Sequence, residues 1–132
     1  MGSKIHSTVV FENGFSGTGN TDNGYSVKIG RHGAAPYDLL CMALASCLYA
    51  TFLDILNKKR INFEGAEIDV SGEKRSEIPT FLEICLVSVS IKGLAKTDRQ
   101  AAEKSFELAT KYCSIYQTLL KVAKLEWRVS FE

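Results

Sequence analysis

The chain has 132 residues, enough for a single domain of ordinary size. Apolar residues make up 45% of the chain and charged residues 23%, a mixture typical of globular domains and not of disordered tails. Sixteen Lys and Arg oppose fifteen Asp and Glu, which gives a net charge of +1. This near balance argues against a nucleic-acid binder, because binding to phosphates requires clustered cations.

The N-terminal segment predicts three short strands. Residues 4–12 alternate between apolar and polar faces, and Asn13-Gly14 is a hairpin turn signal. We expect residues 15–18 to return as a second strand and residues 25–29 to form a third. The glycine-rich stretch 17–24 is predicted to be a loop, and it lacks the lysine and the following helix of a phosphate-binding loop.

A long helix is predicted from Pro36 to about Lys58. Proline suits the first helical turn, and Asp38 suits the positive end of the helix dipole. Apolar residues occur all around this helix, which indicates protein on every side and therefore an obligate dimer. Fifteen uncharged residues lie between Asp38 and Asp54, and as a helix they would span only ~22 Å of the ~30 Å hydrocarbon core. We therefore expect a buried helix and no membrane span.

The second half of the chain predicts strands and helices in the order of a single α+β domain over residues 1–132. Strands are expected at residues 66–74, 80–92 and 125–131. Between the last two strands, the pairs Thr97 with Gln100 and Ser114 with Gln117 resemble capping boxes that begin two helices.

The chain contains four cysteines: Cys41, Cys47, Cys85 and Cys113. No pair has the C-x-x-C spacing of a zinc or redox motif, and the sequence predicts no metal site and no bound cofactor. The N-terminus lacks the apolar stretch of a signal peptide, so we expect a cytoplasmic protein with reduced thiols.

The residues alone leave the roles of the cysteines open. Cys47 lies in the middle of the apolar helix, where a cysteine can simply fill the core, and Cys41 and Cys85 fit the same interpretation. Cys113 directly precedes the expected N-cap Ser114, where unpaired backbone N–H groups lower the pKa of a thiol. Packing between two helices is the alternative for Cys113.

Two motifs, in the right order, resemble the OsmC-like family, the osmotically inducible and organic hydroperoxide resistance proteins. Residues 35–48, APYDLLCMALASCL, resemble the family's central helix, with a cysteine eleven residues after the proline. Residues 112–119, YCSIYQTL, resemble its second motif, a tyrosine-cysteine pair followed by a short helix. The segments 78–81 and 91–93 also match, and the resemblance extends over roughly the whole chain.

The resemblance implies an OsmC-like fold in an intertwined homodimer, with strands around two central helices and a thiol peroxidase site between the subunits. In such an enzyme Cys47 would attack an organic hydroperoxide, and Cys113 would resolve the sulfenic acid to a disulfide. An external dithiol reductant, of the lipoyl type in the best-known branch, would then restore both thiols.

The sequence departs from the family at the groups that activate the thiolate. A mid-helix cysteine gains little from its own helix dipole, so Cys47 needs a cation from elsewhere. The hydroperoxide-reducing branches bring an arginine from the N-terminal strands, whereas the first thirty residues here contain none. Arg31 is the candidate substitute, anchored by Asp38 or by Tyr37, which occupies the position of the family's carboxylate; an exposed loop cation is the alternative.

The sequence therefore predicts thiol-dependent reduction of organic hydroperoxides in oxidative stress defence. The main alternative is an OsmC-like module without peroxidase activity, which binds a small apolar or thiol ligand at the dimer interface. A structural dimer with inert cysteines is the third interpretation.

Overall fold

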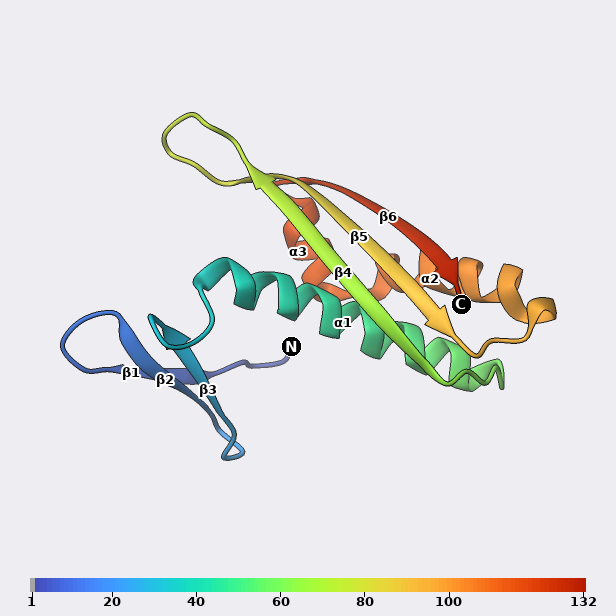
Figure 1. Cartoon of the computed structure of the whole chain (residues 1–132), viewed down its shortest axis with the longest axis horizontal. Helices are drawn as coiled ribbons and strands as arrows, with labels where there is room; N and C mark the ends of the chain where they lie inside the picture. The colour runs from blue at the N-terminus through green and yellow to red at the C-terminus, as the bar shows by residue number, and fades with distance from the viewer. Residues whose placement is uncertain (1) are drawn as a thin grey trace. The chain divides into compact units, whose positions relative to one another are not determined.

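The structure is a computed structural model that describes residues 2–132. These residues form the α+β arrangement that the sequence predicts, and the structure divides its strands into two three-stranded sheets beside three α-helices (Figure 1). The chain divides into two compact units, one ending at Leu40 and the other beginning at Cys41.

The N-terminal unit contains an antiparallel sheet of three consecutive strands: β1 (Ser7–Phe11), β2 (Ser16–Thr21) and β3 (Ser26–Gly30). The register pairs Val9 with Gly19 and Gly19 with Val27, so these residues share one face of the sheet. Val9 and Val27 are 41% and 44% exposed, so this apolar face is largely open in the single chain.

Strand β2 begins within the predicted second strand at residues 15–18 but continues through Gly19 to Thr21, where the prediction of a loop was wrong. A Cβ at Gly17 would lie 2.6 Å from Cδ1 of Phe11, and one at Gly19 would lie 3.1 Å from Cδ1 of Ile29. The missing side chains therefore let large residues of β1 and β3 lie over β2. Glycine here serves a close approach within a sheet and not a turn.

Helix α1 (Pro36–Lys58) has the predicted bounds. At its N-terminus the backbone N–H of Ala35 donates to the carboxylate of Asp38 at 2.9 Å, which is half of a capping box. At the C-terminus Arg60 has a positive φ of 58°, and the N–H of Ile61 donates to the carbonyl of Leu56 at 2.9 Å. These features form a Schellman motif, which satisfies the last carbonyls of the helix.

Helix α1 is not buried on every side in the single chain. Its fully buried residues form one stripe at four-residue spacing: Leu44, Leu48, Phe52 and Leu56. Met42 is 62% exposed, and Ser46 and Ala50 are exposed beside it. By length and hydropathy the helix could cross a membrane, and 22% of its most apolar 18-residue stretch is buried. Core helices of soluble proteins satisfy the same criteria.

The C-terminal unit is built on a mixed sheet of β4 (Gly65–Lys74), β5 (Leu82–Lys92) and β6 (Lys124–Phe131). Figure 1 shows β5 in the middle, antiparallel to β4 and parallel to β6. The connection between the parallel strands carries a 3₁₀ turn (Lys96–Asp98), α2 (Arg99–Tyr112) and α3 (Ser114–Leu120).

The core of this unit joins α1, α2 and β6 through three aromatic rings. Phe106 lies at the centre, with ring centroids 5.4 Å from those of Phe52 and Trp127. Nearby, Lys59 Nζ donates to the buried hydroxyl of Ser105 at 2.8 Å and ties the end of α1 to α2. These contacts fix α1 against the helices that carry the second cysteine motif.

Both predicted capping boxes were wrong. Asp98, and not Thr97, is the N-cap of α2, and its side chain makes no capping hydrogen bond. The N-cap of α3 is Cys113, whose Sγ accepts from the N–H of Tyr116 at 3.4 Å. Gln117 does not complete a box, because its side chain donates to the carbonyl of Thr110 at 2.9 Å.

Candidate active site

The structure brings Cys47 and Cys113 together, as the family resemblance implies. Cys47 lies near the middle of α1 and is half-buried, whereas Cys113 is fully buried at the joint between α2 and α3. The Cys113 thiol makes a side-chain hydrogen bond with the Cys47 sulfur. Both residues are reduced, and both belong to the C-terminal unit.

The first turn of α3 supplies the other contacts of the Cys47 sulfur. The backbone N–H groups of Ser114 and Ile115 donate to it, and the Ser114 hydroxyl does the same. All of these donors are neutral groups that gain most when the sulfur carries a negative charge.

These contacts shift the pKa values of the two thiols in opposite directions. Partial burial alone raises the pKa of Cys47, but hydrogen bonds from Cys113, Ile115 and Ser114 lower this pKa below its ordinary value. Burial and the hydrogen bond given to Cys47 raise the pKa of Cys113 to about 11. At neutral pH the geometry therefore favours a thiolate at Cys47 beside a protonated Cys113.

The helix N–H groups act on both cysteines. We expected them to lower the pKa of Cys113, and those of Tyr116 and Ile115 do so, but burial and the hydrogen bond given to Cys47 outweigh them and the pKa rises. On Cys47 the N–H groups of Ser114 and Ile115 add to the net lowering of the pKa.

The two remaining cysteines belong to the same unit, with Cys85 buried and Cys41 half-buried. Cys85 is 2% exposed on β5, and its Sγ lies 3.9 Å from where a Cβ on Gly72 would be. Burial, followed by the charge of the Cys41 thiolate, raises the pKa of Cys85. Burial and the charges of Cys85 and Cys113 also raise the pKa of Tyr116. These shifts keep Cys85 and Tyr116 protonated and favour a packing role.

Arg31 lies in a tight turn of the N-terminal unit. Gly30, with φ of 100°, begins the turn, and the N–H of Arg31 donates to the carbonyl of Phe15 at 2.8 Å. A Cβ on Gly33 would lie 2.1 Å from the carbonyl oxygen of Lys28, so only glycine fits there. The turn fixes the backbone that presents the exposed Arg31 side chain.

The two residues expected to anchor the Arg31 side chain, Asp38 and Tyr37, both lie in the first turn of α1. Asp38 caps α1, and no ion pair joins it to Arg31 within residues 2–132. Tyr37 is 39% exposed in the first turn of the helix. Arg31 and Cys47 belong to different units, so activation of Cys47 by Arg31 stays a prediction.

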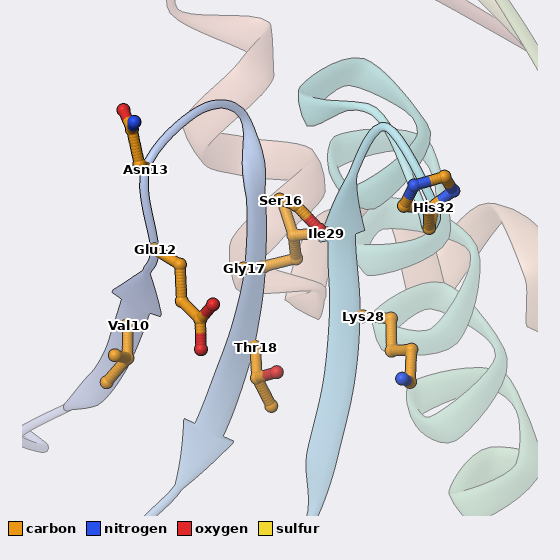
Figure 2. A pocket seen from close by; sticks show the side chains of 9 residues that line it. All are labelled: Val10, Glu12, Asn13, Ser16, Gly17, Thr18, Lys28, Ile29 and His32. Atoms are coloured by element: carbon orange, nitrogen blue, oxygen red, sulfur yellow. The ribbon is translucent and has the colours of Figure 1, made fainter.

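A polar groove of about 600 Å³ lies on the N-terminal unit, lined by side chains of β1, β2, β3 and the following turn (Figure 2). Its charged and titratable residues are Glu12, Lys28 and His32, and it contains no cysteine. Among residues 2–132, no three His, Cys, Asp or Glu side chains are grouped to hold a metal ion.

Comparison with solved structures supports the fold over its full length. A hypothetical protein from Aquifex aeolicus VF5 has a TM-score of 0.81 at 23% identity, covering 98% of each chain. An OsmC like protein from Mycoplasma pneumoniae has a TM-score of 0.83 at 21% identity, covering 99% of each chain. An organic hydroperoxide resistance protein from Elizabethkingia anophelis has a TM-score of 0.74 at 15% identity, covering 100% of this chain and 99% of that one.

None of the curated proteins compared with the chain matches it. The family model described as OsmC-like protein matches residues 29–128, a range that contains α1, both cysteine motifs and the β4–β6 sheet except the end of β6. The chain therefore belongs to the OsmC-like protein family.

Proposed function

We propose that the protein is a thiol-dependent hydroperoxide reductase that acts in oxidative stress defence. The observation that carries this proposal is the contact between Cys47 and Cys113, whose pKa values shift in opposite directions. A two-cysteine peroxidase needs this asymmetry, with one thiolate to attack and one thiol to resolve. Among the structural neighbours, the Elizabethkingia anophelis protein is named for organic hydroperoxide resistance.

In the first step the Cys47 thiolate attacks the terminal oxygen of an organic hydroperoxide. An S–O bond forms, the O–O bond breaks, and the alkoxide leaves and takes a proton from solvent to become an alcohol. The sulfur is oxidised to a sulfenic acid while the peroxide is reduced. A lowered pKa at Cys47 increases the fraction of thiolate available for this attack at neutral pH.

In the second step Cys113 resolves the sulfenic acid. Because its pKa is about 11, Cys113 still carries its proton when the sulfenic acid forms. An S–S bond forms, and the sulfenic hydroxyl leaves with that proton as water. An external dithiol of the lipoyl type then exchanges with this disulfide. Both protein thiols are regenerated, and the dithiol is oxidised to its own disulfide. We place this reaction in the cytoplasm.

The proposal includes a homodimer, because α1 presents uncovered surface in the single chain. Met42, Ser46 and Ala50 are exposed along one side of the helix, and the apolar face of β1–β3 is open. A second copy would cover the helix with the same surface of its own α1 and produce a self-complementary interface.

The test is oxidation of the pure protein by one equivalent of cumene hydroperoxide. We expect a loss of two hydrogens and one peptide cross-link, between Cys47 and Cys113. Cys47→Ser should abolish peroxide consumption, whereas Cys113→Ser should consume one equivalent and stop at the sulfenic acid. Cys85→Ser is the control and should behave as the parent.

Turnover should be measured with dihydrolipoamide and with thioredoxin as alternative reductants. Preference for dihydrolipoamide would support the proposed dithiol. If the native protein neither consumes hydroperoxide nor forms the cross-link, the interpretation as a binding module replaces the enzyme.

A further inference from the structure

The groove of about 600 Å³ on the N-terminal unit has the size of a small-molecule binding site. We propose that it binds a short peptide with free termini, whose carboxylate contacts Lys28 and His32 and whose ammonium group contacts Glu12. The groove contains no cysteine and belongs to the N-terminal unit, so this proposal is independent of the peroxidase function proposed above.

Opposite charges face the groove from its two sides. Val10 on β1, Thr18 on β2 and Lys28 on β3 are in register, so their side chains share one face of the sheet. Figure 2 shows the carboxylate of Glu12 and the ammonium group of Lys28 on opposite sides of Thr18. The two outer strands are about 10 Å apart, because neighbouring strands are separated by about 4.8 Å. A ligand that contacts both groups must therefore carry opposite charges at separated ends.

The polar side chains that line the groove make no hydrogen bond or ion pair within residues 2–132. They are Glu12, Asn13, Ser16, Thr18, Lys28 and His32. Elsewhere in the same unit polar side chains pair locally: Nδ1 of His6 lies 2.7 Å from the Asp22 carboxylate, and the Ser26 hydroxyl donates to Asn20 at 3.2 Å. The groups of the groove are therefore available to the N–H and C=O groups of a peptide.

Backbone hydrogen bonds fix the end of the groove that carries His32. The N–H of Ala34 donates to the carbonyl of Lys28 at 2.9 Å, and the N–H of Arg31 donates to the carbonyl of Phe15 at 2.8 Å. These bonds fold the turn back along β3 and hold the backbone of His32 beside it. A site that is already formed loses less conformational entropy when a ligand binds.

The combination of charges argues against simpler ligands. A simple anion would meet the carboxylate of Glu12, and a simple cation would meet the ammonium group of Lys28, and each contact between like charges is unfavourable. A zwitterion satisfies both residues. An extended peptide of three residues spans about 10 Å, which matches the separation of β1 and β3 across β2.

The test is a titration of the isotope-labelled full-length protein with trialanine, followed by the amide chemical shifts in NMR spectra. We expect saturable shifts confined to the amides of residues 10–18 and 28–33. N-acetyl-trialanine lacks the ammonium group and trialanine amide lacks the carboxylate. Each should bind about fivefold more weakly than trialanine, because each loses one exposed ion pair.

Two charge variants assign the ends of the peptide. Glu12→Gln should weaken the binding of trialanine about fivefold and leave that of N-acetyl-trialanine unchanged. Lys28→Ala should weaken trialanine to the same extent and leave trialanine amide unchanged. Lys4→Ala is the matched control and should bind as the parent, because Lys4 is an exposed cation of the same unit that does not line the groove. Circular dichroism establishes that each variant is folded.

The proposal is overturned if trialanine produces no saturable shifts, or if the uncharged N-acetyl-trialanine amide binds as tightly as trialanine. Equal weakening of all the peptides in both charge variants would contradict the assignment of the two ends. Alanine itself, bound as tightly as trialanine, would contradict a ligand that spans β2.

Discussion

Cysteine is a weak hydrogen-bond acceptor, yet the sulfur of Cys113 caps α3 where a serine or aspartate is usual. This choice places a second thiol beside Cys47 and leaves the hydroxyl of Ser114 to the neighbouring sulfur. The pair of cysteines was predictable from the two motifs. The hydrogen-bond donors around Cys47 were not predictable, because they depend on how α1 packs against the first turn of α3, which is far away in the sequence.

At the residue scale, the role of Arg31 is open to a direct test. If Arg31 contributes charge at the site, Arg31→Ala should raise the pKa of Cys47 and slow its alkylation at neutral pH, because the thiolate loses a favourable cation. The measurement is the pH profile of alkylation, compared with Lys28→Ala, which removes a cation from the same unit. Identical profiles for Arg31→Ala and the parent would show that Arg31 is a solvated loop residue.

At the scale of the elements, the prediction succeeded where pattern and packing agree. The bounds of α1 follow from proline at its start and the apolar run that ends at basic residues. Strand β2 was predicted at residues 15–18, but its continuation to Thr21 was missed because glycine propensity argues against strands, whereas here neighbouring side chains occupy the space that the glycines leave. The helix caps were predicted wrongly for two reasons. A 3₁₀ turn precedes α2 where a Thr97 cap was expected, and the Cys113 thiol caps α3 where the Ser114 hydroxyl was expected.

The aromatic cluster at the centre of the C-terminal unit gives a prediction about stability. Phe106 is fully buried between Phe52 and Trp127, so Phe106→Ala should lower the free energy of unfolding by about 3–5 kcal/mol through lost burial and a residual cavity. Urea unfolding at fixed protein concentration measures this loss. Leu108→Ala is the control on the same helix and should cost about 0.5 kcal/mol, because Leu108 is 37% exposed. Equal losses in both variants would contradict the assignment of the core.

At the scale of the whole molecule, the central question is what covers α1. Its exposed side combines an apolar residue with small ones, Met42 with Ser46 and Ala50, and small residues let two helices approach closely. The helix also satisfies the length and hydropathy criteria for a membrane span, so a bilayer is the competing environment. Asp54 continues the exposed side of the helix, and a carboxylate there favours a protein partner over lipid.

We therefore predict that the protein sediments at micromolar concentration with a mass about twice 14.6 kDa. Ala50→Arg should shift the protein towards monomer, because a long charged side chain would separate two helices that meet at this small residue. Gln100→Arg adds the same charge to an exposed position of α2 and should remain dimeric. A native protein that sediments as a folded monomer would contradict the dimer, and one that floats with lipid vesicles would assign the exposed side of α1 to a membrane instead.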